Sequence, residues 1–302
     1  MSRRMLAPLA ALAALLIAVA PVSAAPFPAR VDLPDGWAPE GITAGRGSTA
    51  YVGSLADGAI ERVNVRTGDR SLLAPGAAGR ITVGLDYERR ANRLWAAGGS
   101  GEVRAYDAGT GALLETYTFG PGFLNDVVVT QEAVFVTNSN VAELEVIPLP
   151  ADGSLPDPSA AFALPLTGDL VYTAGFNANG IVARAGWLVV VQSSTGGLFR
   201  VDPSTGATTA IDLGGFEPVT AGDGLELRGS TLYVVRNQLN RVEAFRLGAR
   251  LASAHHLRTI TSPDLAIPTT VAFLAGRLWA VNARFGTPVT PTTDYWITRL
   301  SR

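Results

Sequence analysis

The chain has 302 residues, of which 47% are hydrophobic and 17% charged, so it can bury a sizeable core and is not a disordered, collagen-like or coiled-coil protein. Its 24 basic residues are all arginine and are nearly balanced by 26 acidic residues, which argues against a nucleic-acid partner. Cysteine is absent, which excludes disulfides and zinc–thiolate sites. Lysine is absent as well, which excludes Schiff-base chemistry and a P-loop. Because only two histidines are present, any chemistry has to rely on oxygen-bearing side chains.

Residues 1–24 have the pattern of an export signal. Two arginines precede an apolar run from Met5 to Ala20, and a small-x-small cleavage pattern follows at Val22-Ser23-Ala24. The run is shorter than the roughly 20 residues of a membrane-spanning helix, although an uncleaved anchor is the alternative. We therefore expect residues 25–302 to form one domain of a secreted or periplasmic protein that is not stably inserted in a membrane.

Glycine turns recur along the rest of the chain at a nearly constant spacing. Each follows a short strand-like run, and the turn glycines are Gly68, Gly111, Gly153, Gly206 and Gly248. They are separated by 43, 42, 53 and 42 residues. Because a four-stranded blade has about this length, and because the repeating runs are too short for helices, the spacing predicts a β-propeller.

The second strand of each repeat is the clearest, and six copies are present, at residues 50–52, 94–96, 134–136, 188–190, 232–234 and 278–280. The last repeat is one strand short, because the chain ends soon after Tyr295-Trp296-Ile297. We expect the run from Ala29 to Leu33 to supply the missing outer strand and close the ring. The sequence thus predicts an all-β, six-bladed propeller of four-stranded blades, with a proline-containing surface loop between the third and fourth blades.

Polar residues recur where the first strand of each blade begins, a position that faces the central channel. Four of the six positions carry a carboxylate or an amide, namely Glu40, Asn125, Asn179 and Asp223. Facing one another, these groups would be unpaired or mutually repelled unless water or a cation lay between them. An Asn-Gly or Asp-Gly alone is typical of a turn, but the recurrence in register predicts a metal site. Calcium suits such hard oxygen ligands best, and magnesium, manganese or zinc are the alternatives.

These motifs resemble those of the senescence marker protein/gluconolactonase family of six-bladed propellers and, more distantly, those of strictosidine synthases and paraoxonases. The resemblance covers most of the mature chain. It implies that Glu40, Asn179 and Asp223, each followed by glycine, bind a metal and that Asn125 lies beside both metal and substrate. It also implies that Asp223 acts as the general base. One departure is Thr137-Asn138-Ser139, where family members often have Thr-Asp-Ser.

A divalent cation beside a carboxylate suits the hydrolysis of a lactone or ester, because the cation polarises the carbonyl and the carboxylate takes a proton from water. A Ser-His-Asp site is not expected, because His255 and His256 fall in an outermost strand. The expected substrate contacts are Asn125, Asn138, Gln192, Arg236, Asn237, Asn282 and Arg284. The arginines either hold a substrate carboxylate or phosphate or pair with acids on the rim, and Phe285 is either a pocket wall or packing.

Two functions of different classes remain open. The first is an exported metal-dependent hydrolase of lactones or related esters that acts on a small molecule. The second is a non-catalytic ligand-binding propeller whose metal is structural. A propeller that joins two carbons, as strictosidine synthases do, is the least favoured, because the sequence does not fix which way Glu226 faces. Protein partners are not indicated by the sequence.

Overall fold

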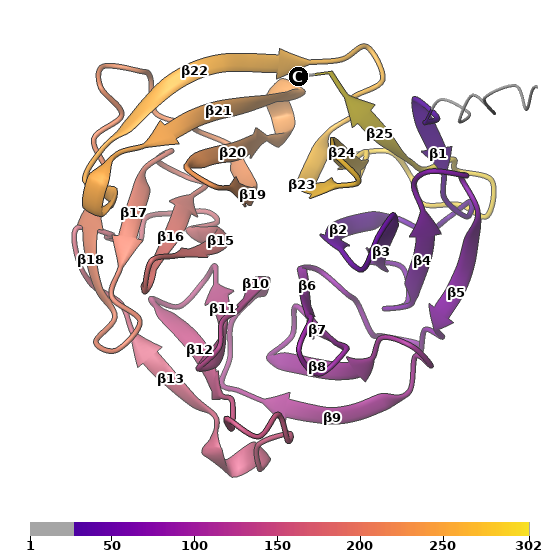
Figure 1. Ribbon diagram of the computed structural model, residues 1–302, viewed down its shortest axis with the longest axis horizontal. Coiled ribbons are helices and arrows are strands. Elements are labelled where there is room, and N and C mark those ends of the chain that lie inside the picture. The colour runs from indigo at the N-terminus through magenta and orange to yellow at the C-terminus, as the bar shows by residue number, and fades with distance from the viewer. Residues whose placement is uncertain (1–26, 302) are drawn as a thin grey trace, which may run out of the picture.

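The computed structural model describes residues 27–301 and consists of six β-sheets arranged as blades around a central channel (Figure 1). The six-bladed propeller predicted from the glycine spacing is therefore confirmed. The expected export signal lies outside the described residues. Within the described part of the chain, no helix has the length and apolar character needed to cross a membrane.

The first three blades each contain four antiparallel strands that follow in chain order from the channel outward. Blade one consists of β2 (Pro39–Ala44), β3 (Thr49–Ser54), β4 (Ile60–Asn64) and β5 (Arg70–Ala74). Blade two consists of β6 (Leu85–Glu88), β7 (Arg93–Ala97), β8 (Glu102–Asp107) and β9 (Leu113–Thr118). Blade three consists of β10 (Leu124–Val129), β11 (Ala133–Asn138), β12 (Glu143–Pro148) and β13 (Phe162–Pro165), and a short 3-10 turn, η1 (Pro158–Ala160), precedes β13.

The fourth blade differs from the others because it has a fifth strand. It consists of β15 (Ala178–Arg184), β16 (Trp187–Gln192), β17 (Leu198–Val201) and β18 (Ala207–Ala210), with β14 (Thr167–Gly168) added in parallel to β18. The prediction of four strands thus omitted β14, a two-residue pairing made where the chain leaves blade three along the outer edge of blade four. Such a pairing is too short to leave a period in the sequence.

Blade five consists of β19 (Gly222–Arg228), β20 (Thr231–Arg236), β21 (Arg241–Leu247) and β22 (Ala254–Thr261), with the 3-10 turns η2 (Asn237–Leu239) and η3 (Ala249–Leu251). Blade six combines β23 (Pro268–Leu274), β24 (Arg277–Asn282) and β25 (Trp296–Leu300) with β1 (Arg30–Asp32). Strand β1 pairs antiparallel with β25, and buried Val31 lies opposite buried Ile297. The first and last described strands therefore meet in one blade, which leaves no gap in the ring (Figure 1).

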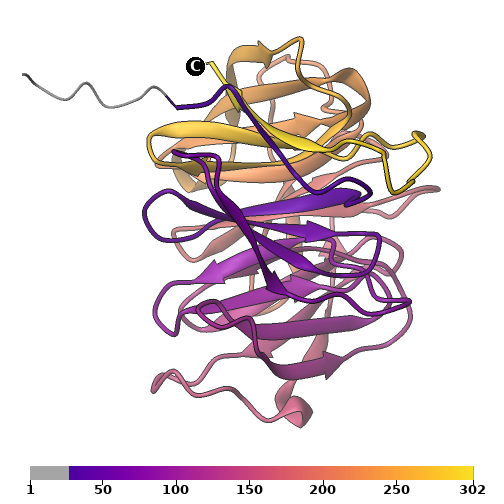
Figure 2. The same ribbon diagram turned by 90° about the vertical axis from the view of Figure 1, so that its right-hand side faces the viewer.

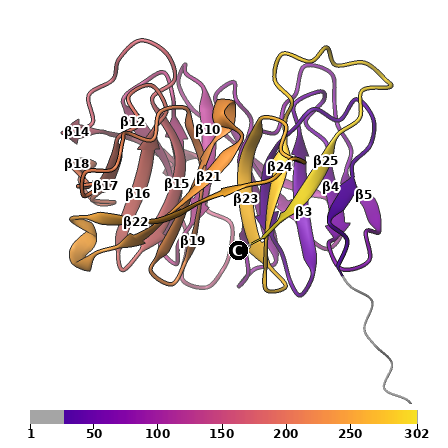
Figure 3. The same cartoon turned by 90° about the horizontal axis from the view of Figure 1, so that it is seen from above.

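Apolar side chains fill the spaces between neighbouring blades. Trp95 of β7 packs with residues of β10 and β11, and Trp279 of β24 packs with residues of β2 and β3; both tryptophans are fully buried. Figures 2 and 3 show the ring from its side, with strands running across its thickness and loops on both faces. The long loop between β24 and β25 rises from one face in Figure 3. This packing holds the first strands rigidly around the channel.

Candidate functional site

Glycines that follow the channel-facing residues allow the first strands to lie close together. A Cβ atom on Gly84 would lie 2.6 Å from the carbonyl oxygen of Asn125 in the next blade, and one on Gly41 would overlap the carbonyl oxygen of Val83. A Cβ atom on Gly180 or Gly224 would likewise be too close to the backbone of the following blade. The Glu-Gly, Asn-Gly and Asp-Gly pairs are therefore strand motifs rather than turns, and they narrow the ring of polar side chains.

One cavity, which we call the upper chamber, holds the four residues expected to bind a metal. It has a volume of about 670 Å³ and is lined by Glu40, Leu55, Val83, Phe123, Asn125, Ala174, Gly175, Phe176, Asn179, Ser193, Ser194, Ala221, Asp223, Asn237, Gln238 and Phe285. Glu40, Asn125, Asn179 and Asp223 come from the first strands of blades one, three, four and five. The structure thus brings together side chains that are as much as 183 positions apart in the sequence.

Each of three channel-facing side chains is oriented by a partner 14 residues later in the sequence. The Asn125 amide donates to the Ser139 hydroxyl at 3.0 Å, and the Asn179 amide donates to the Ser193 hydroxyl at 3.0 Å. In blade five the roles are reversed, because the Asn237 amide donates to Asp223 Oδ2 at 2.6 Å. With their amide nitrogens held by serines, Asn125 and Asn179 keep their side-chain oxygens available to a ligand.

The two carboxyl groups of the upper chamber are both buried and influence each other. Burial, reinforced by the charges of Asp223 and Asp126, raises the pKa of Glu40 well above its ordinary value. Burial also raises the pKa of Asp223 to about 7, although the amides of Asn237 and Asn179 oppose this shift. Two buried acids that each disfavour ionisation of the other create a local demand for positive charge.

The donor atoms of the upper chamber fit a hard cation. Within residues 27–301, the carboxylate of Glu40 has no hydrogen-bond partner, although Glu40 is only 6% exposed. The side-chain oxygen of Asn179 is buried and also lacks a partner within that range. Over the same residues, no group of three or more His, Cys, Asp or Glu side chains could hold a metal. A cation in the upper chamber would therefore rely on amide oxygens as well as two carboxylates, a donor set that suits calcium.

Five of the expected substrate contacts lie outside the upper chamber, which corrects that part of the prediction. Asn138, Gln192 and Asn282 are each the last residue of a second strand and are at most 2% exposed. Their amides bond to other parts of the protein: Asn138 to Glu145, Gln192 to Asn177, and Asn282 to Thr298. These side chains point into the blades because the loop backbone beside them needs hydrogen-bond partners.

The two arginines expected to hold an anionic substrate are used within the protein. Arg236 is 2% exposed, donates to Glu217 at 2.7 Å and to the carbonyl oxygen of Thr220 at 3.0 Å. Arg284 is paired with Asp294 in the loop between β24 and β25. Both arginines therefore pair with acids on the rim, which is the alternative given above. Asn237 and Phe285, by contrast, line the upper chamber.

The histidines lie far from the channel, as the sequence predicted. His255 and His256 belong to β22, the outermost strand of blade five. The ring of His256 stacks on Phe216, with centroids 4.0 Å apart, and its Nε2 lies 3.0 Å from a Glu243 oxygen. Neither histidine lines the upper chamber, so acid–base chemistry there falls to carboxylates.

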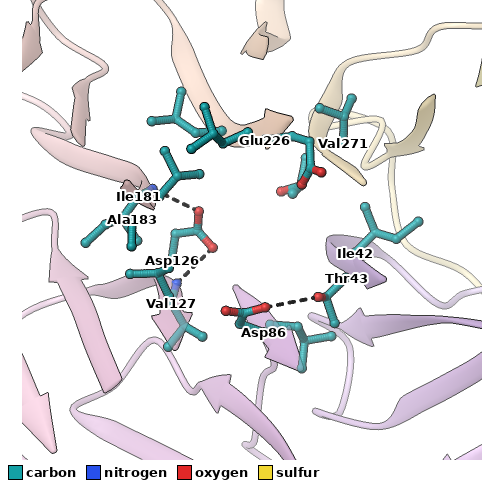
Figure 4. Close-up of a pocket in the computed structure, with 15 residues that line it drawn as sticks. Ile42, Thr43, Asp86, Asp126, Val127, Ile181, Ala183, Glu226 and Val271 are labelled. Atoms are coloured by element: carbon teal, nitrogen blue, oxygen red, sulfur yellow. Dashed lines mark hydrogen bonds between the residues drawn. The ribbon is translucent and has the colours of Figure 1, made fainter. Parts of the chain in front are cut away.

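A second cavity, which we call the lower chamber, lies further along the same first strands and was not predicted. It has a volume of about 210 Å³, and Asp86, Asp126 and Glu226 point into it among aliphatic side chains (Figure 4). Burial raises the pKa of Asp126 to about 7 and that of Glu226 to about 8, and it also raises the pKa of Asp86. This chamber is therefore a second, smaller concentration of acids.

The acids of the lower chamber hold neighbouring blades together. Asp86 accepts hydrogen bonds from the backbone amides of Tyr87 and Val129, the latter in blade three, at 2.7 and 2.8 Å. Asp126 accepts from the amides of Val127 and Ile181, the latter in blade four, at 2.9 and 3.2 Å (Figure 4). Glu226 accepts from the amide of Phe273 in blade six at 3.2 Å. These bonds satisfy backbone donors that would otherwise face the channel.

Two regular spacings in the sequence could have identified the functional residues that the prediction missed, one of three residues and one of 14. Thr43, Asp86 and Glu226 each lie three positions after an upper-chamber residue: Glu40, Val83 and Asp223 respectively. Ordinary strand alternation brings residues two apart to one face, but β2 and β19 carry register shifts near their starts. A bulge of this kind changes the alternation, so a residue three positions later also faces the channel. The second spacing, 14 residues after Asn125 and after Asn179, identifies Ser139 and Ser193 as their hydrogen-bond partners.

Comparison with known proteins supports the architecture. No profile of a known protein family and no curated protein sequence matches this chain. The fold is similar to the major Malassezia sympodialis allergen Mala s 1, with a TM-score of 0.68, 16% identity, and coverage of 91% of this chain and 97% of that chain. It is also similar to virginiamycin B lyase from Staphylococcus aureus, with a TM-score of 0.59, 13% identity, and coverage of 82% and 80%. A candidate 6-phosphogluconolactonase from Bacteroides uniformis has a TM-score of 0.54, 20% identity, and coverage of 79% and 72%. At these identities the similarity shows the fold alone.

Proposed function

We propose that the protein is an exported, metal-dependent hydrolase of lactones or related esters whose site is the upper chamber. The observation that carries this proposal is a pair of buried carboxyl groups, Glu40 and Asp223, beside an unpaired buried amide oxygen of Asn179. Uncompensated buried oxygens of this kind are costly unless a cation joins them. The N-terminal arginines and apolar run support export, and the lactonase-like structural neighbour is consistent with the reaction class.

Glu40, Asp223, Asn125 and Asn179 would hold the cation, with calcium as the favoured ion. When bound, the cation would supply Lewis-acid stabilisation of negative charge on the substrate carbonyl oxygen. Glu40, which has no other partner in the described chain, would supply charge to the site. The serines behind Asn125 and Asn179 would keep both amide oxygens aimed at the channel.

Asp223 would act as the general base. It lines the upper chamber, where a substrate and an attacking water have room, and the Asn237 amide fixes its carboxylate through Oδ2. A bound cation would counteract the rise that burial causes in the pKa of Asp223, and so would favour the ionised form that a general base requires. The other oxygen of Asp223 remains to take a proton from water.

A ligand-binding propeller with a structural metal is the second candidate. It is favoured by one observation: among the described residues that line the upper chamber, none is histidine, lysine or arginine. A hydrolase would therefore have to rely on the carboxyl groups of Glu40 and Asp223 both to activate water and to protonate the leaving group. Both candidate functions include the cation, but only the hydrolase converts a substrate.

The decisive experiment is hydrolysis of a panel of lactones and esters by chelator-treated protein to which calcium or manganese is restored. We expect Asp223→Asn to lower kcat at least about 100-fold while the thermal unfolding curve stays cooperative. Asp152→Asn, in the exposed loop before η1, is the matched control and should keep full activity. Equal turnover by Asp223→Asn and the parent contradicts the enzyme proposal, and turnover of no substrate favours the binding protein.

A further inference from the structure

Aromatic side chains from three separate loops line the upper chamber. Phe123 precedes β10, Phe176 precedes β15, and Phe285 lies between β24 and β25. Phe123 and Phe176 meet edge to face with ring centroids 5.3 Å apart, which holds both rings in place. Phe176 is 49% exposed and Phe285 is 39% exposed. Large apolar side chains left in water around a cavity are typical of a binding site for an apolar ligand.

The polar lining residues of the upper chamber that are not expected metal ligands come from two neighbouring blades. Apart from the expected metal ligands, the polar lining residues are Ser193 and Ser194 of blade four and Asn237 and Gln238 of blade five. Blades one, two and six contribute Leu55, Val83 and Phe285 instead. A sugar lactone has a hydroxyl group on nearly every ring carbon, so this half of the chamber would leave several of them unpaired.

Among residues 27–301, none of those that line the chamber offers a cationic group to an acidic substrate. Arg236 and Arg284, the nearby arginines, are paired with Glu217 and Asp294 and do not line the cavity. Phosphate and carboxylate groups are ordinarily bound by arginine or lysine side chains. The remaining charges in the chamber belong to Glu40 and Asp223, which repel an anion that is not held by the metal.

We infer that the substrate is an uncharged lactone or ester that carries an alkyl chain or aryl ring, and that Phe123, Phe176 and Phe285 select it over sugar lactones and their phosphates. This inference rests on the proposed hydrolase function. The carbonyl group would lie over Glu40 and Asp223, and the apolar group would lie among the phenylalanines that line the chamber. A volume of about 670 Å³ has room for such a molecule.

The reaction balances without a further reactant. The oxygen of water forms a bond to the carbonyl carbon, and its proton passes to Asp223. The bond between the carbonyl carbon and the ring oxygen then breaks, and Asp223 returns the proton to that ring oxygen. One lactone and one water give one hydroxy acid.

The test combines turnover and binding across a series of chain lengths. Calcium-loaded protein is assayed on γ-butyrolactone, γ-hexalactone and γ-decalactone, and on glucono-δ-lactone and its 6-phosphate. In parallel, calorimetry measures the binding of 2-alkylcyclopentanones, which have the same chains but cannot be hydrolysed. We expect both kcat/KM and affinity to rise with chain length, by up to roughly fourfold for each fully buried CH₂.

Two serine variants test the role of the phenylalanines. Phe176→Ser and Phe285→Ser should each reduce the dependence of both kcat/KM and ketone affinity on chain length. Phe162→Ser is the matched control, because Phe162 is 47% exposed but lies in β13, the outermost strand of blade three. It should leave the whole profile unchanged.

The outcomes separate this inference from the proposed function. Hydrolysis with no dependence on chain length, or with a preference for glucono-δ-lactone or its phosphate, overturns the apolar substrate and leaves the hydrolase standing. Chain-length-dependent binding of the ketones without turnover of any lactone supports an apolar ligand and contradicts the hydrolase. An unchanged profile in both Phe176→Ser and Phe285→Ser also overturns the role of the phenylalanines in selecting the substrate.

Discussion

The upper and lower chambers are built on the same ring of first strands, yet their acids have different surroundings. In the lower chamber Asp86 and Asp126 each accept two backbone hydrogen bonds, and Glu226 accepts one. In the upper chamber Glu40 has no partner among the described residues, and Asp223 is bonded through Asn237. The comparison indicates that lower-chamber acids stabilise the ring, whereas upper-chamber acids are left free for a ligand.

The two chambers also differ in what surrounds the acids. The lower chamber is small, and aliphatic residues such as Ile42, Ile181 and Val271 line it (Figure 4). The upper chamber has roughly three times the volume, and three phenylalanines line it. A site for chemistry needs space for substrate and water, so the larger chamber is the one in which the proposed reaction fits.

The largest expected effect on stability is that of Asp126→Ala. This change leaves the amides of Val127 and Ile181 without their partner and breaks a link between blades three and four. We expect the free energy of unfolding to fall by roughly 3 kcal/mol. Chemical denaturation of metal-free protein measures the difference. Asp126→Asn, which keeps one acceptor oxygen, should lose clearly less, and equal losses would contradict the hydrogen-bonding role.

The second-largest effect is expected in the pH dependence of stability, to which Glu226 should contribute. Its ordinary pKa of 4.5 is raised to about 8 in the folded protein by burial. The folded state therefore binds the proton more tightly than the unfolded state, and stability should fall as pH rises from about 4.5 to 8. Denaturation in the presence of a chelator should show that the parent loses roughly 2 kcal/mol more than Glu226→Gln over this range, after allowance for solvent in the chamber. Parallel pH profiles for parent and variant would contradict this account of the lower chamber.

Removal of an acid from the upper chamber should not lower the stability of the metal-free protein as Asp126→Ala does. Glu40→Gln removes a buried, unpaired carboxyl that lies near Asp223. Without metal, the variant should therefore be as stable as the parent within about 1 kcal/mol, or slightly more stable. Thermal unfolding in a chelator measures this. A loss as large as that of Asp126→Ala would mean that Glu40 has a structural partner after all.

The smallest effect is expected on the rim. Arg284→Gln breaks an ion pair with Asp294, whose side chain is 56% exposed, and such pairs contribute at most about 1 kcal/mol. Lactone turnover should remain within about twofold of the parent, since Arg284 does not line the upper chamber. Turnover that drops tenfold or more, measured with the unfolding curve unchanged, would return Arg284 to the substrate site.

The fold could be read from the sequence because its signals are periodic. Turn glycines recur about every 43 residues, and the run from Ala29 to Leu33 includes the strand that pairs with β25. Strand β14 left no such signal, because it pairs through only two residues.

The site could be read only in part. Glu40, Asn125, Asn179 and Asp223 were found because they stand at equivalent positions of their blades. Asn138 and Gln192 were expected beside the substrate because strand ends face the same rim, but the orientation of a side chain at a strand end depends on its local hydrogen bonds. The lower chamber was missed because bulges change the alternation that the prediction assumed.

The central claim is that the upper chamber binds one divalent cation through Glu40 and Asp223. Its most direct test is a calorimetric titration of calcium into chelator-treated protein, with Glu40→Gln and Asp223→Asn as site variants and Glu226→Gln as the lower-chamber control. We predict one calcium per chain for the parent and for Glu226→Gln, and at least tenfold weaker binding for both site variants. Absence of binding by the parent, or a loss in Glu226→Gln that is not seen in Glu40→Gln and Asp223→Asn, would contradict the account.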